Sequence, residues 1–275
     1  MSTLQLRDPA FRRITALMHS AVGLSFSDSK KSLVSSRLSS RVQRLGLSSF
    51  DEYADLLDSP EDGGEFQCAV DLLTTNETYF FREPAHYQVL EQELARTRPQ
   101  HLRVWSAASS FGDEAYSTAM LLADMQVQGR VGPDWSILGT DISDRVLQSA
   151  TQAVYPADRL REVSPERLKR YCLRGDGESE GLVQIQDKLR EHVKFGQLNL
   201  CAPMDGITGL GPFDVVFLRN VLIYFDPPTK VAVVDRVLAH LKPGGLFFIG
   251  TAEGRVACKT PLAVLAPGAF RKVAG

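Results

Sequence analysis

Leu102-Arg-Val-Trp-Ser-Ala-Ala-Ser-Ser-Phe-Gly-Asp-Glu114 is the stretch that decides the fold class of this 275-residue chain. Residues 102–107 form a short apolar run of the kind found in buried strands. A turn of small residues follows, and an amphipathic pattern then continues from residue 113 to residue 125. A buried strand that turns directly into a helix is the repeating unit of parallel α/β proteins. The stretch therefore predicts the first strand and the first helix of such a sheet.

The same alternation of apolar runs and amphipathic segments continues towards the end of the chain. Residues 263–273 have Pro267-Gly268 at their centre, which is typical of a β-hairpin. We therefore predict an α/β fold whose mainly parallel sheet is closed by an antiparallel pair. Further strands are expected at 136–140, 193–198, 213–218 and 246–250, the last after a tight turn at 241–245, and further helices at 144–153 and 229–241.

The first 90 residues have helical periodicity. Asp8 followed by Pro9 is a typical helix start, Gly46 is a candidate helix end, and Ser49 is a candidate N-cap. We predict a helical N-terminal domain, residues 1–90, and an α/β domain, residues 91–275. The helices are expected at 8–19, 29–45, just after residue 49, 65–73 and 84–96.

The segment between residues 155 and 192 is too long for an ordinary connection between a helix and a strand. It contains a helical pattern at 165–171, the turn Gly175-Asp-Gly177, and an alternating run at 182–185 that predicts an exposed strand. We interpret this segment as a small antiparallel β-subdomain inserted into the α/β domain.

The composition excludes several classes of protein. The N-terminus lacks the pattern of a secretory signal and the apolar runs are shorter than a membrane span, so we expect a cytoplasmic protein without membrane insertion. The four cysteines form no CxxC pair and the five histidines show no short ligand spacing, which argues against a metal site. A net charge of −2 gives no reason to expect nucleic-acid binding.

Positive charge is concentrated near the N-terminus, where residues 1–50 contain eight lysines and arginines against two aspartates. Lys30, Arg37, Arg41 and Arg44 fall within roughly 60° of one another on a helical projection, with no acidic residue between them. The pattern fits a solvated helix face. The mutual repulsion of four cations nevertheless favours a docking site for an acidic partner.

The turn after the first strand lacks the GxGxxG pattern that accommodates a dinucleotide, and it carries the carboxylates of Asp113 and Glu114 instead. Acidic residues at this position suit a cationic ligand, such as the sulfonium and ammonium groups of S-adenosylmethionine. Asp141 ends the second strand, where a carboxylate commonly binds both ribose hydroxyls. Taken singly, each residue equally fits a helix dipole partner or an N-cap.

Polar residues also follow two later strands at the same edge of the predicted sheet. Asn199-Leu200 follows the strand at 193–198, and Arg219-Asn220 follows the strand at 213–218. Ligands bind in open parallel sheets beyond the carboxyl ends of the strands. These residues are therefore candidates for binding the same cofactor, although Asn199 and Asn220 also fit simple loop caps.

Several motifs closely resemble those of one family, the chemotaxis receptor methyltransferases, commonly called CheR. They are KSLVSSRL at 31–38, TTNETYFFRE at 74–83, RVWSAA at 103–108, GDEAYS at 112–117 and FDVVFLRNVLIYF at 213–225. The resemblance implies a Rossmann-like S-adenosylmethionine-dependent methyltransferase that esterifies glutamate side chains of bacterial chemoreceptors for chemotactic adaptation, with S-adenosylhomocysteine as the other product. It also implies that Tyr224 faces the reacting methyl and that the cofactor is lined by Asn76, Thr78, Arg82, Glu114, Asp141, Asn199, Leu200, Arg219 and Asn220.

Two motifs depart from the family pattern. The family usually has Thr-Gly-Glu-Glu-Pro-Tyr-Ser where this chain has FGDEAYS at 111–117, and Gly-His-Ser-Glu-Asn where this chain has GTAEG at 250–254. The first change keeps the second carboxylate, Glu114. The second change leaves the substrate side of the site less defined.

The chemistry implied by the resemblance needs little acid–base catalysis, because a glutamate acceptor is already ionised near neutrality. Positioning and water exclusion should dominate. We therefore assign Tyr224 an orienting role, since a protonated phenol is a poor base. The plain alternative is a core aromatic that follows an apolar strand.

The glycine-containing segment at 174–181 resembles the longer form of the family's β-subdomain, which in relatives pairs an edge strand with the C-terminal tail of a receptor. Gly175 and Gly177 are the candidate residues, and a plain glycine-rich hairpin is the alternative. The partners implied are the methylation helices of chemoreceptors and this tail peptide. A small-molecule methyltransferase would not explain the basic helix or the insertion. The departures at Phe111, Ala115 and Thr251 leave a second alternative, a noncatalytic receptor-binding adaptor that retains the fold, and weak or absent cofactor binding would distinguish it.

Overall fold

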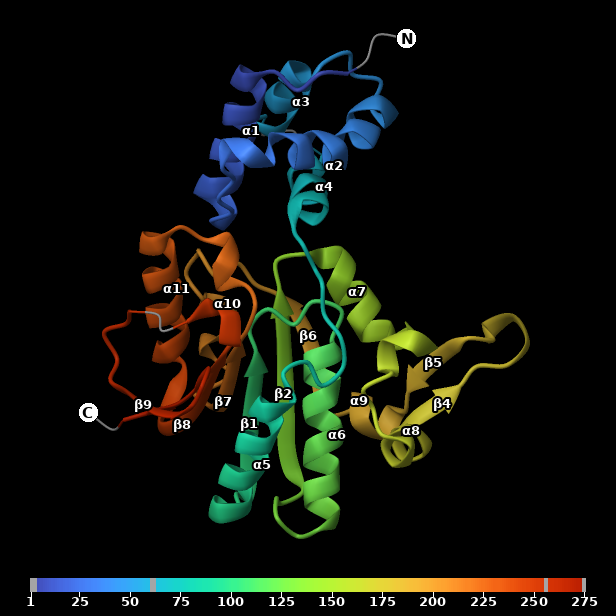
Figure 1. The fold of residues 1–275 in the computed structure, drawn as a ribbon, viewed down its shortest axis with the longest axis vertical. Coiled ribbons are helices and arrows are strands. Elements are labelled where there is room, and N and C mark those ends of the chain that lie inside the picture. Colours follow the sequence, from blue (N-terminus) through green and yellow to red (C-terminus); the bar gives the residue numbers. More distant parts are fainter. Residues whose placement is uncertain (1–3, 60–62, 255–256, 274–275) are drawn as a thin grey trace.

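The computed structural model describes residues 4–59, 63–254 and 257–273. A helical domain lies at one end of the molecule, an α/β domain forms its body, and a small three-stranded sheet projects from the side of that body (Figure 1). In the described part of the chain, no helix combines the length and the apolar character needed to cross a membrane.

The helical domain forms because amphipathic helices bury one face each around a common core. The first helix begins at Asp8, with Pro9 in its first turn, and it continues past the expected end at residue 19 to Val22, where Gly23 ends it with φ 74°. The Ser49 hydroxyl caps the third helix by accepting from the Glu52 N–H, as predicted. The core contains Ile14, Met18 and Leu38, all fully buried. The helices are α1 (Asp8–Val22), α2 (Lys31–Arg44), α3 (Phe50–Leu57) and α4 (Glu65–Leu73), with a 3-10 turn, η1 (Asp28–Lys30), before α2.

Helix α5 (Pro84–Thr97) packs with the α/β domain and not with the helical domain. Its residues Tyr87, Leu90 and Leu94 are buried in the same core as the first strand and α6. The helical core ends at Leu73. The two cores therefore separate close to residue 74, earlier than the boundary at residue 90 expected from the sequence.

The main sheet has the strand order β6-β2-β1-β7-β8-β10-β9. The five strands from β6 to β8 are parallel, and the hairpin predicted at 263–273 is confirmed as the antiparallel pair that closes the sheet. The chain order reverses between β1 and β7, which places the ligand crevice of an open α/β sheet at their carboxyl ends. The strands are β1 (His101–Ser106), β2 (Asp134–Asp141), β6 (Val193–Gln197), β7 (Phe213–Leu218), β8 (Leu241–Ile249), β9 (Leu262–Ala266) and β10 (Ala269–Lys272).

Helices cover both faces of this sheet, and each face has its own apolar core. One core includes α5 and α6, and the other includes α11. The remaining helices are α6 (Asp113–Val127), α7 (Asp144–Gln152), α9 (Asp187–Arg190), α10 (Asp205–Thr208) and α11 (Pro227–Ala239), with 3-10 turns η2 (Ala157–Leu160), η3 (Gly177–Ser179), η4 (Leu222–Tyr224) and η5 (Thr251–Glu253).

The tight turn expected at 241–245 does not precede the strand but lies within it. These residues belong to β8, where the register with β7 shifts between Phe213 and Val215. Gly244 adopts φ 77°, so the glycine pair forms a bulge within the paired strand. A proline followed by two glycines can therefore lie within an irregular strand, and this pattern alone does not place a turn outside the strand.

The insertion predicted between residues 155 and 192 is present. Its strands β3 (Val154–Pro156), β4 (Cys172–Arg174) and β5 (Leu182–Ile185) form an antiparallel sheet in the order β3-β5-β4, with α8 (Pro165–Tyr171) before β4. The expectation that 182–185 forms an exposed strand is wrong in one respect. β5 is the central strand, and its Val183 and Ile185 are buried, so the open edges belong to β3 and β4.

Candidate active site

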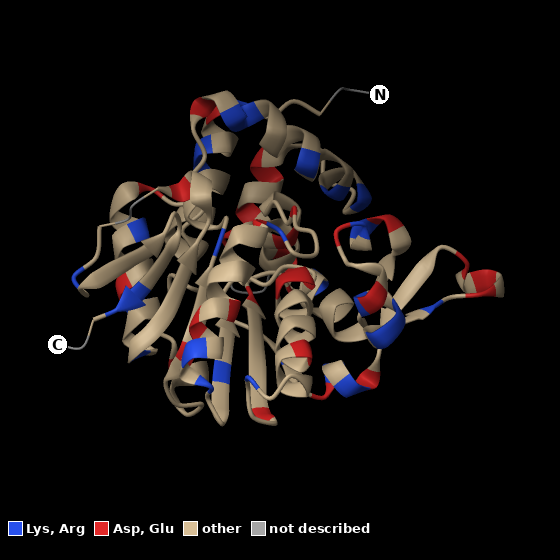
Figure 2. Ribbon diagram, turned by 60° about the horizontal axis from the view of Figure 1, so that its bottom comes forward, with Lys and Arg blue, Asp and Glu red and all other residues tan. Residues whose placement is uncertain are grey.

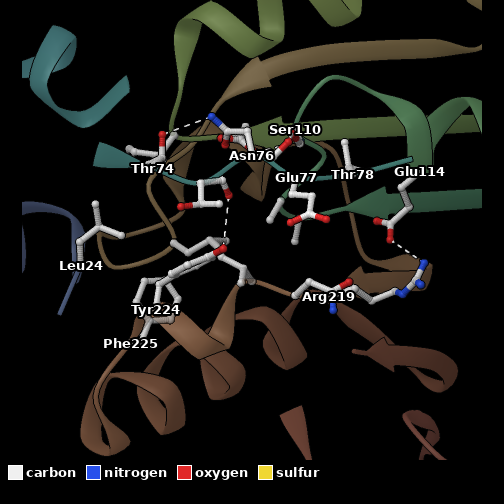
Figure 3. A pocket seen from close by; sticks show the side chains of 18 of the residues that line it. Leu24, Thr74, Asn76, Glu77, Thr78, Ser110, Glu114, Arg219, Tyr224 and Phe225 are labelled. Atoms are coloured by element: carbon white, nitrogen blue, oxygen red, sulfur yellow. Dashed lines mark hydrogen bonds and ion pairs between the residues drawn. The ribbon is translucent and has the colours of Figure 1, made fainter. Parts of the chain in front are cut away.

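An open pocket lies at the carboxyl ends of the parallel strands, between them and the helical domain (Figure 3). Its lining contains all ten residues predicted to contact the cofactor or the reacting methyl. They come from five separate segments: the linker after α4, the start of the helix α6, the end of β2, the loop after β6 and the loop after β7. These ten residues are Asn76, Thr78, Arg82, Glu114, Asp141, Asn199, Leu200, Arg219, Asn220 and Tyr224.

Asp141 is fixed at the end of β2 by backbone donors. Its Oδ2 accepts from the Ser110 N–H at 2.9 Å and its Oδ1 accepts from the Ser143 N–H at 3.0 Å. Burial raises the pKa of Asp141, and the N–H donors oppose that effect. A carboxylate has about four acceptor sites, so Asp141 retains capacity to accept from a ligand in the pocket.

The two carboxylates at the start of α6 have different roles, so the expectation that both face a cationic ligand is wrong for Asp113. Asp113 is fully buried away from the pocket and pairs with Arg159 at 2.7 Å. Glu114 lines the pocket, where it accepts from the Ser106 hydroxyl at 2.6 Å and pairs with Arg219 at 3.0 Å. Burial raises the pKa of both carboxyl groups, and the paired arginine opposes it in each case.

Arg219 is buried and joins the loop after β7 to the linker. It pairs with Glu114 and Glu83 and donates to the carbonyl oxygen of Arg82. Asn220 follows with φ 60°, a left-handed conformation that costs free energy in a residue other than glycine. This loop therefore holds a defined shape that its local sequence does not favour.

The linker between the two domains forms one wall of the pocket. The Asn76 amide donates to the Thr74 hydroxyl at 3.3 Å, and the Asn76 carbonyl accepts from the Ser110 hydroxyl at 3.0 Å (Figure 3). Arg82 donates to the Glu77 carbonyl at 2.9 Å. These contacts curl the linker over the turn after β1, so that Asn76, Glu77 and Arg82 line the same cavity.

The helical domain covers the end of the pocket near the strand β6. Val22 and Leu24 line the cavity from the end of α1, and the Asn199 amide donates to the Ala21 carbonyl at 2.7 Å. The Ser25 N–H also donates to the Tyr224 carbonyl at 2.9 Å. A Cβ placed on Gly23 would lie 2.4 Å from the Cys201 Sγ, so the two domains are in close contact here.

Tyr224 lies in η4, directly after the strand β7 and its polar loop. Its ring lines the pocket, and its hydroxyl donates to the Thr75 carbonyl at 3.4 Å (Figure 3). The residue is only partly buried, and the ring also packs against the core of the helical domain. Its side chain therefore presents a hydroxyl to the cavity while its ring joins the domains.

Several lining residues were not predicted from the sequence. Val22, at the end of an apolar helix face, and Leu24, just after that helix, carry no signal of their own, because only the docking of the domains brings them to the cavity. Glu77 lies within a motif that was recognised, and its carboxylate could have been found by its place between Asn76 and Thr78. The other unpredicted lining residues are Thr74, Thr75, Tyr79, Ala107, Ala108, Ser110, Ile142, Leu198, Val221 and Phe225.

The chemical character of the pocket lining fits S-adenosylmethionine. Leu24, Leu198 and Leu200 supply apolar walls, Asp141 has free acceptor capacity, and Glu114 supplies negative charge. A mainly parallel sheet closed by an antiparallel pair, with a carboxylate at the end of its second strand and no GxGxxG turn, defines the class of S-adenosylmethionine-dependent methyltransferases.

The chain belongs to the CheR methyltransferase family. The family model "CheR methyltransferase, all-alpha domain" matches residues 9–74, and the model "CheR methyltransferase, SAM binding domain" matches residues 76–264. S-adenosylmethionine is therefore the cofactor. The two models meet at the point where the two apolar cores separate.

Similar proteins extend over nearly the whole chain. The chemotaxis protein methyltransferase of Escherichia coli (strain K12) is 42% identical over 250 residues, which cover 91% of this chain and 86% of that protein. Chemotaxis protein methyltransferase 2 of Pseudomonas aeruginosa is 42% identical over 90% of this chain and 86% of its own length. Chemotaxis protein methyltransferase 1 of Vibrio cholerae is 37% identical over 92% of both chains. The chain is thus a methyltransferase of chemotaxis.

Proposed function

We propose that this protein transfers a methyl group from S-adenosylmethionine to glutamate side chains on the cytoplasmic helices of chemoreceptors, and that it acts in the cytoplasm. The observation that carries the proposal is the Tyr224 hydroxyl at the cofactor pocket of a chemotaxis methyltransferase. A glutamate acceptor is ionised near neutrality, so the site needs no strong base. Its task is to hold the carboxylate in line with the methyl group and to exclude water.

We assign each residue of the pocket lining a role in binding the cofactor or the acceptor. S-adenosylmethionine supplies the electrophilic methyl group when bound. Asp141 would accept from the ribose hydroxyls, Arg82 would hold the cofactor carboxylate, and Glu114 would face its positive charge. Asn76, Thr78, Asn199, Leu200 and Asn220 would complete the walls, and Arg219 would hold Glu114 in place. Tyr224 would orient the acceptor carboxylate through its hydroxyl.

A Tyr224→Phe variant should separate cofactor binding from methyl transfer. It keeps the ring that joins the domains and removes only the hydroxyl. We expect kcat to fall by about 10-fold, which corresponds to the loss of roughly one hydrogen bond in the transition state, while the cofactor Kd changes by less than about 2-fold. Methyl incorporation and calorimetric titration measure the two quantities. A Kd that weakens as much as kcat would contradict an orienting role.

Receptor docking is proposed for the basic residues Lys30, Arg37, Arg41 and Arg44. The structure shows that two of them are engaged in contacts within the protein. Arg41 is not free, because it forms an ion pair with the buried Glu65. Arg37 donates to the carbonyl oxygens of Leu73 and Thr74 and so holds the start of the linker. The repulsion expected among four unpaired cations is therefore reduced, because Glu65 compensates the charge of Arg41. Lys30 and Arg44 are exposed at the surface of the helical domain, which carries several basic segments (Figure 2).

Charge reversal at these two exposed positions tests the docking proposal. A Lys30→Glu/Arg44→Glu variant should bind a receptor cytoplasmic fragment about 10-fold to 100-fold more weakly at low salt, and the difference should shrink as salt rises. Its Tm should stay close to that of the wild type. Arg41→Gln is the matched contrast, since loss of its pair with Glu65 should lower Tm. Unchanged receptor binding by the double variant, measured by calorimetry at low salt, would exclude this docking surface.

Recruitment by a receptor tail is proposed for the β-subdomain, through Gly175, Gly177 and the open edge of β4. Leu173 on this strand is 53% exposed, and Leu182 on β5 is also exposed, so an apolar strip lies beside the free edge. A strand added at this edge would gain main-chain hydrogen bonds and these apolar contacts. The matched test compares a receptor with its C-terminal tail and the same receptor without it. If the protein binds both receptors equally well, the tail is not recognised, and the glycine-rich segment is a plain hairpin.

One pair of measurements tests the whole proposal. S-adenosylhomocysteine is titrated calorimetrically, and alkali-labile methyl incorporation is then measured in a panel of chemoreceptor cytoplasmic fragments. Cofactor binding with alkali-labile label on a receptor is the expected result. Receptor binding without cofactor binding would instead support the noncatalytic adaptor.

A further inference from the structure

Glu253 closes η5, and its carboxylate accepts hydrogen bonds from a loop more than thirty residues earlier in the chain. Its Oε2 accepts from the Asn220 N–H at 2.9 Å and from the Gly250 N–H at 2.7 Å. Its Oε1 accepts from the Leu222 N–H at 2.7 Å. Three backbone donors from two segments thus converge on one carboxylate, an arrangement that proteins otherwise use to bind anions.

The loop held in this way is the one that leads from β7 to α11. It contributes Arg219, Asn220 and Tyr224 to the pocket. Asn220 adopts φ 60°, a conformation that the chain keeps only when its surroundings stabilise it. The Asn220 N–H is bound by Glu253, so the carboxylate stabilises the strained residue directly. The Leu222 N–H is bound by the other oxygen, which fixes the turn that carries Tyr224.

We propose that Glu253 is a positioning residue that sets the conformation of residues 219–224, and through it the cofactor affinity and the orientation of Tyr224. Glu253 does not line the pocket, and both of its oxygens are used by backbone donors. It therefore acts through the loop and makes no contact with the reacting atoms. The part of this proposal that concerns turnover rests on the proposed function, whereas the part that concerns cofactor affinity does not.

The surroundings of Glu253 leave little freedom for the loop. Burial raises the pKa of Glu253, and the N–H groups of Asn220, Gly250 and Leu222 oppose that effect, so these backbone dipoles stabilise the carboxylate. A Cβ on Gly250 would lie 2.6 Å from the Asn220 Nδ2 and 2.9 Å from the Glu253 Oε2. A side chain at position 250 would thus displace the side chain of Asn220 or that of Glu253.

Chemical rescue tests the proposal. A Glu253→Ala variant removes the carboxylate but leaves the converging N–H groups, and it should bind S-adenosylhomocysteine at least about 10-fold more weakly than the wild type. Sodium formate, compared with sodium chloride at equal ionic strength, should restore most of that affinity. Glu253→Gln is the matched control. Its amide fills the space and turns an NH₂ group towards a backbone donor, so we expect a similar loss without rescue.

A second pair of variants disturbs the contact from the other side. Gly250→Ala should weaken S-adenosylhomocysteine binding by about 5-fold or more, because its Cβ displaces Asn220 or Glu253. Gly206→Ala is the control, since its Cβ would meet nothing within 4 Å. In receptor assays, the kcat of Glu253→Ala should fall further than its cofactor affinity does, and formate should raise both.

Two results would overturn the proposal. One is a Glu253→Ala variant with wild-type cofactor affinity. The other is a folded Glu253→Ala variant whose weakened binding formate leaves unchanged, which would mean a general structural role. A wild-type protein that binds S-adenosylhomocysteine but methylates no receptor fragment would refute the proposed function instead, and the affinity measurements would still decide the role of Glu253.

Discussion

An Asp141→Ala variant is expected to bind S-adenosylmethionine and S-adenosylhomocysteine about 100-fold more weakly than the wild type, since hydrogen bonds to a charged group contribute about 1.5–3 kcal/mol each. Asp141 is buried at the end of β2, where the N–H groups of Ser110 and Ser143 donate to its carboxylate. The substitution removes the ligand contacts and also frees the turns at Ser110 and Ser143. Calorimetric titration of S-adenosylhomocysteine measures the loss.

Two controls separate the effect on the ligand from the effect on the fold. Asp144→Ala removes an exposed carboxylate three residues later, which accepts a hydrogen bond from the Gln148 amide, and its cofactor affinity should match the wild type. Asp141→Asn keeps one acceptor and should have an intermediate affinity. Equal affinities for Asp141→Ala and the wild type would show that the ribose is bound elsewhere.

An Arg219→Met variant is expected to lower the free energy of unfolding by about 3–5 kcal/mol, the usual cost of leaving a buried charge without its partner. The Arg219 side chain is 2% exposed and pairs with Glu114 and Glu83. Methionine fills much of the space but leaves both carboxylates uncompensated. Denaturant unfolding at pH 7 measures the loss, and Arg96→Met, which removes an exposed cation, is the control and should change little.

The same variant has a defined pH dependence. Burial already raises the pKa of Glu114, and loss of the Arg219 charge should raise it further. An acid whose pKa is raised by folding gains stability relative to the unfolded chain as the pH falls, because the folded form takes up the proton first. The stability deficit of Arg219→Met should therefore be smaller at pH 5 than at pH 7. An Arg219→Met/Glu114→Gln variant should recover part of the loss at pH 7, and a deficit that is equal at both pH values would contradict this account.

Much of the pocket could be predicted because local patterns mark the ends of strands. Asp141, Asn199 and Arg219 each follow an apolar run, and the order of the runs brings them to one edge of the sheet. The linker residues needed the family motif as well, because no periodicity identifies them. Strand and helix ranges with strong patterns, such as 213–218 and 65–73, agree with the structure residue for residue.

The predictions that the structure corrects share a physical cause: each depends on a contact between segments that are distant in sequence. Asp113 and Glu114 are neighbours, and only the position of Arg159 decides which of them turns from the pocket. Arg41 has the same helical phase as the other basic residues, yet Glu65 on another helix neutralises it. Strands β3 and β4 are three residues long, too short for a periodic signal, so the central place of β5 could not be inferred.

The close fit between the end of α1 and the α/β domain limits how this enzyme can be re-engineered. Gly23 has no room for a side chain against Cys201, His19 pairs with Asp226 at 2.6 Å, and Asn199 binds the backbone of α1. The helical and α/β domains are thus not interchangeable modules. A chimera that borrows a helical domain to redirect methylation to another receptor must import residues 19–25 and their facing residues as one matched set, or it will lose a wall of its cofactor pocket.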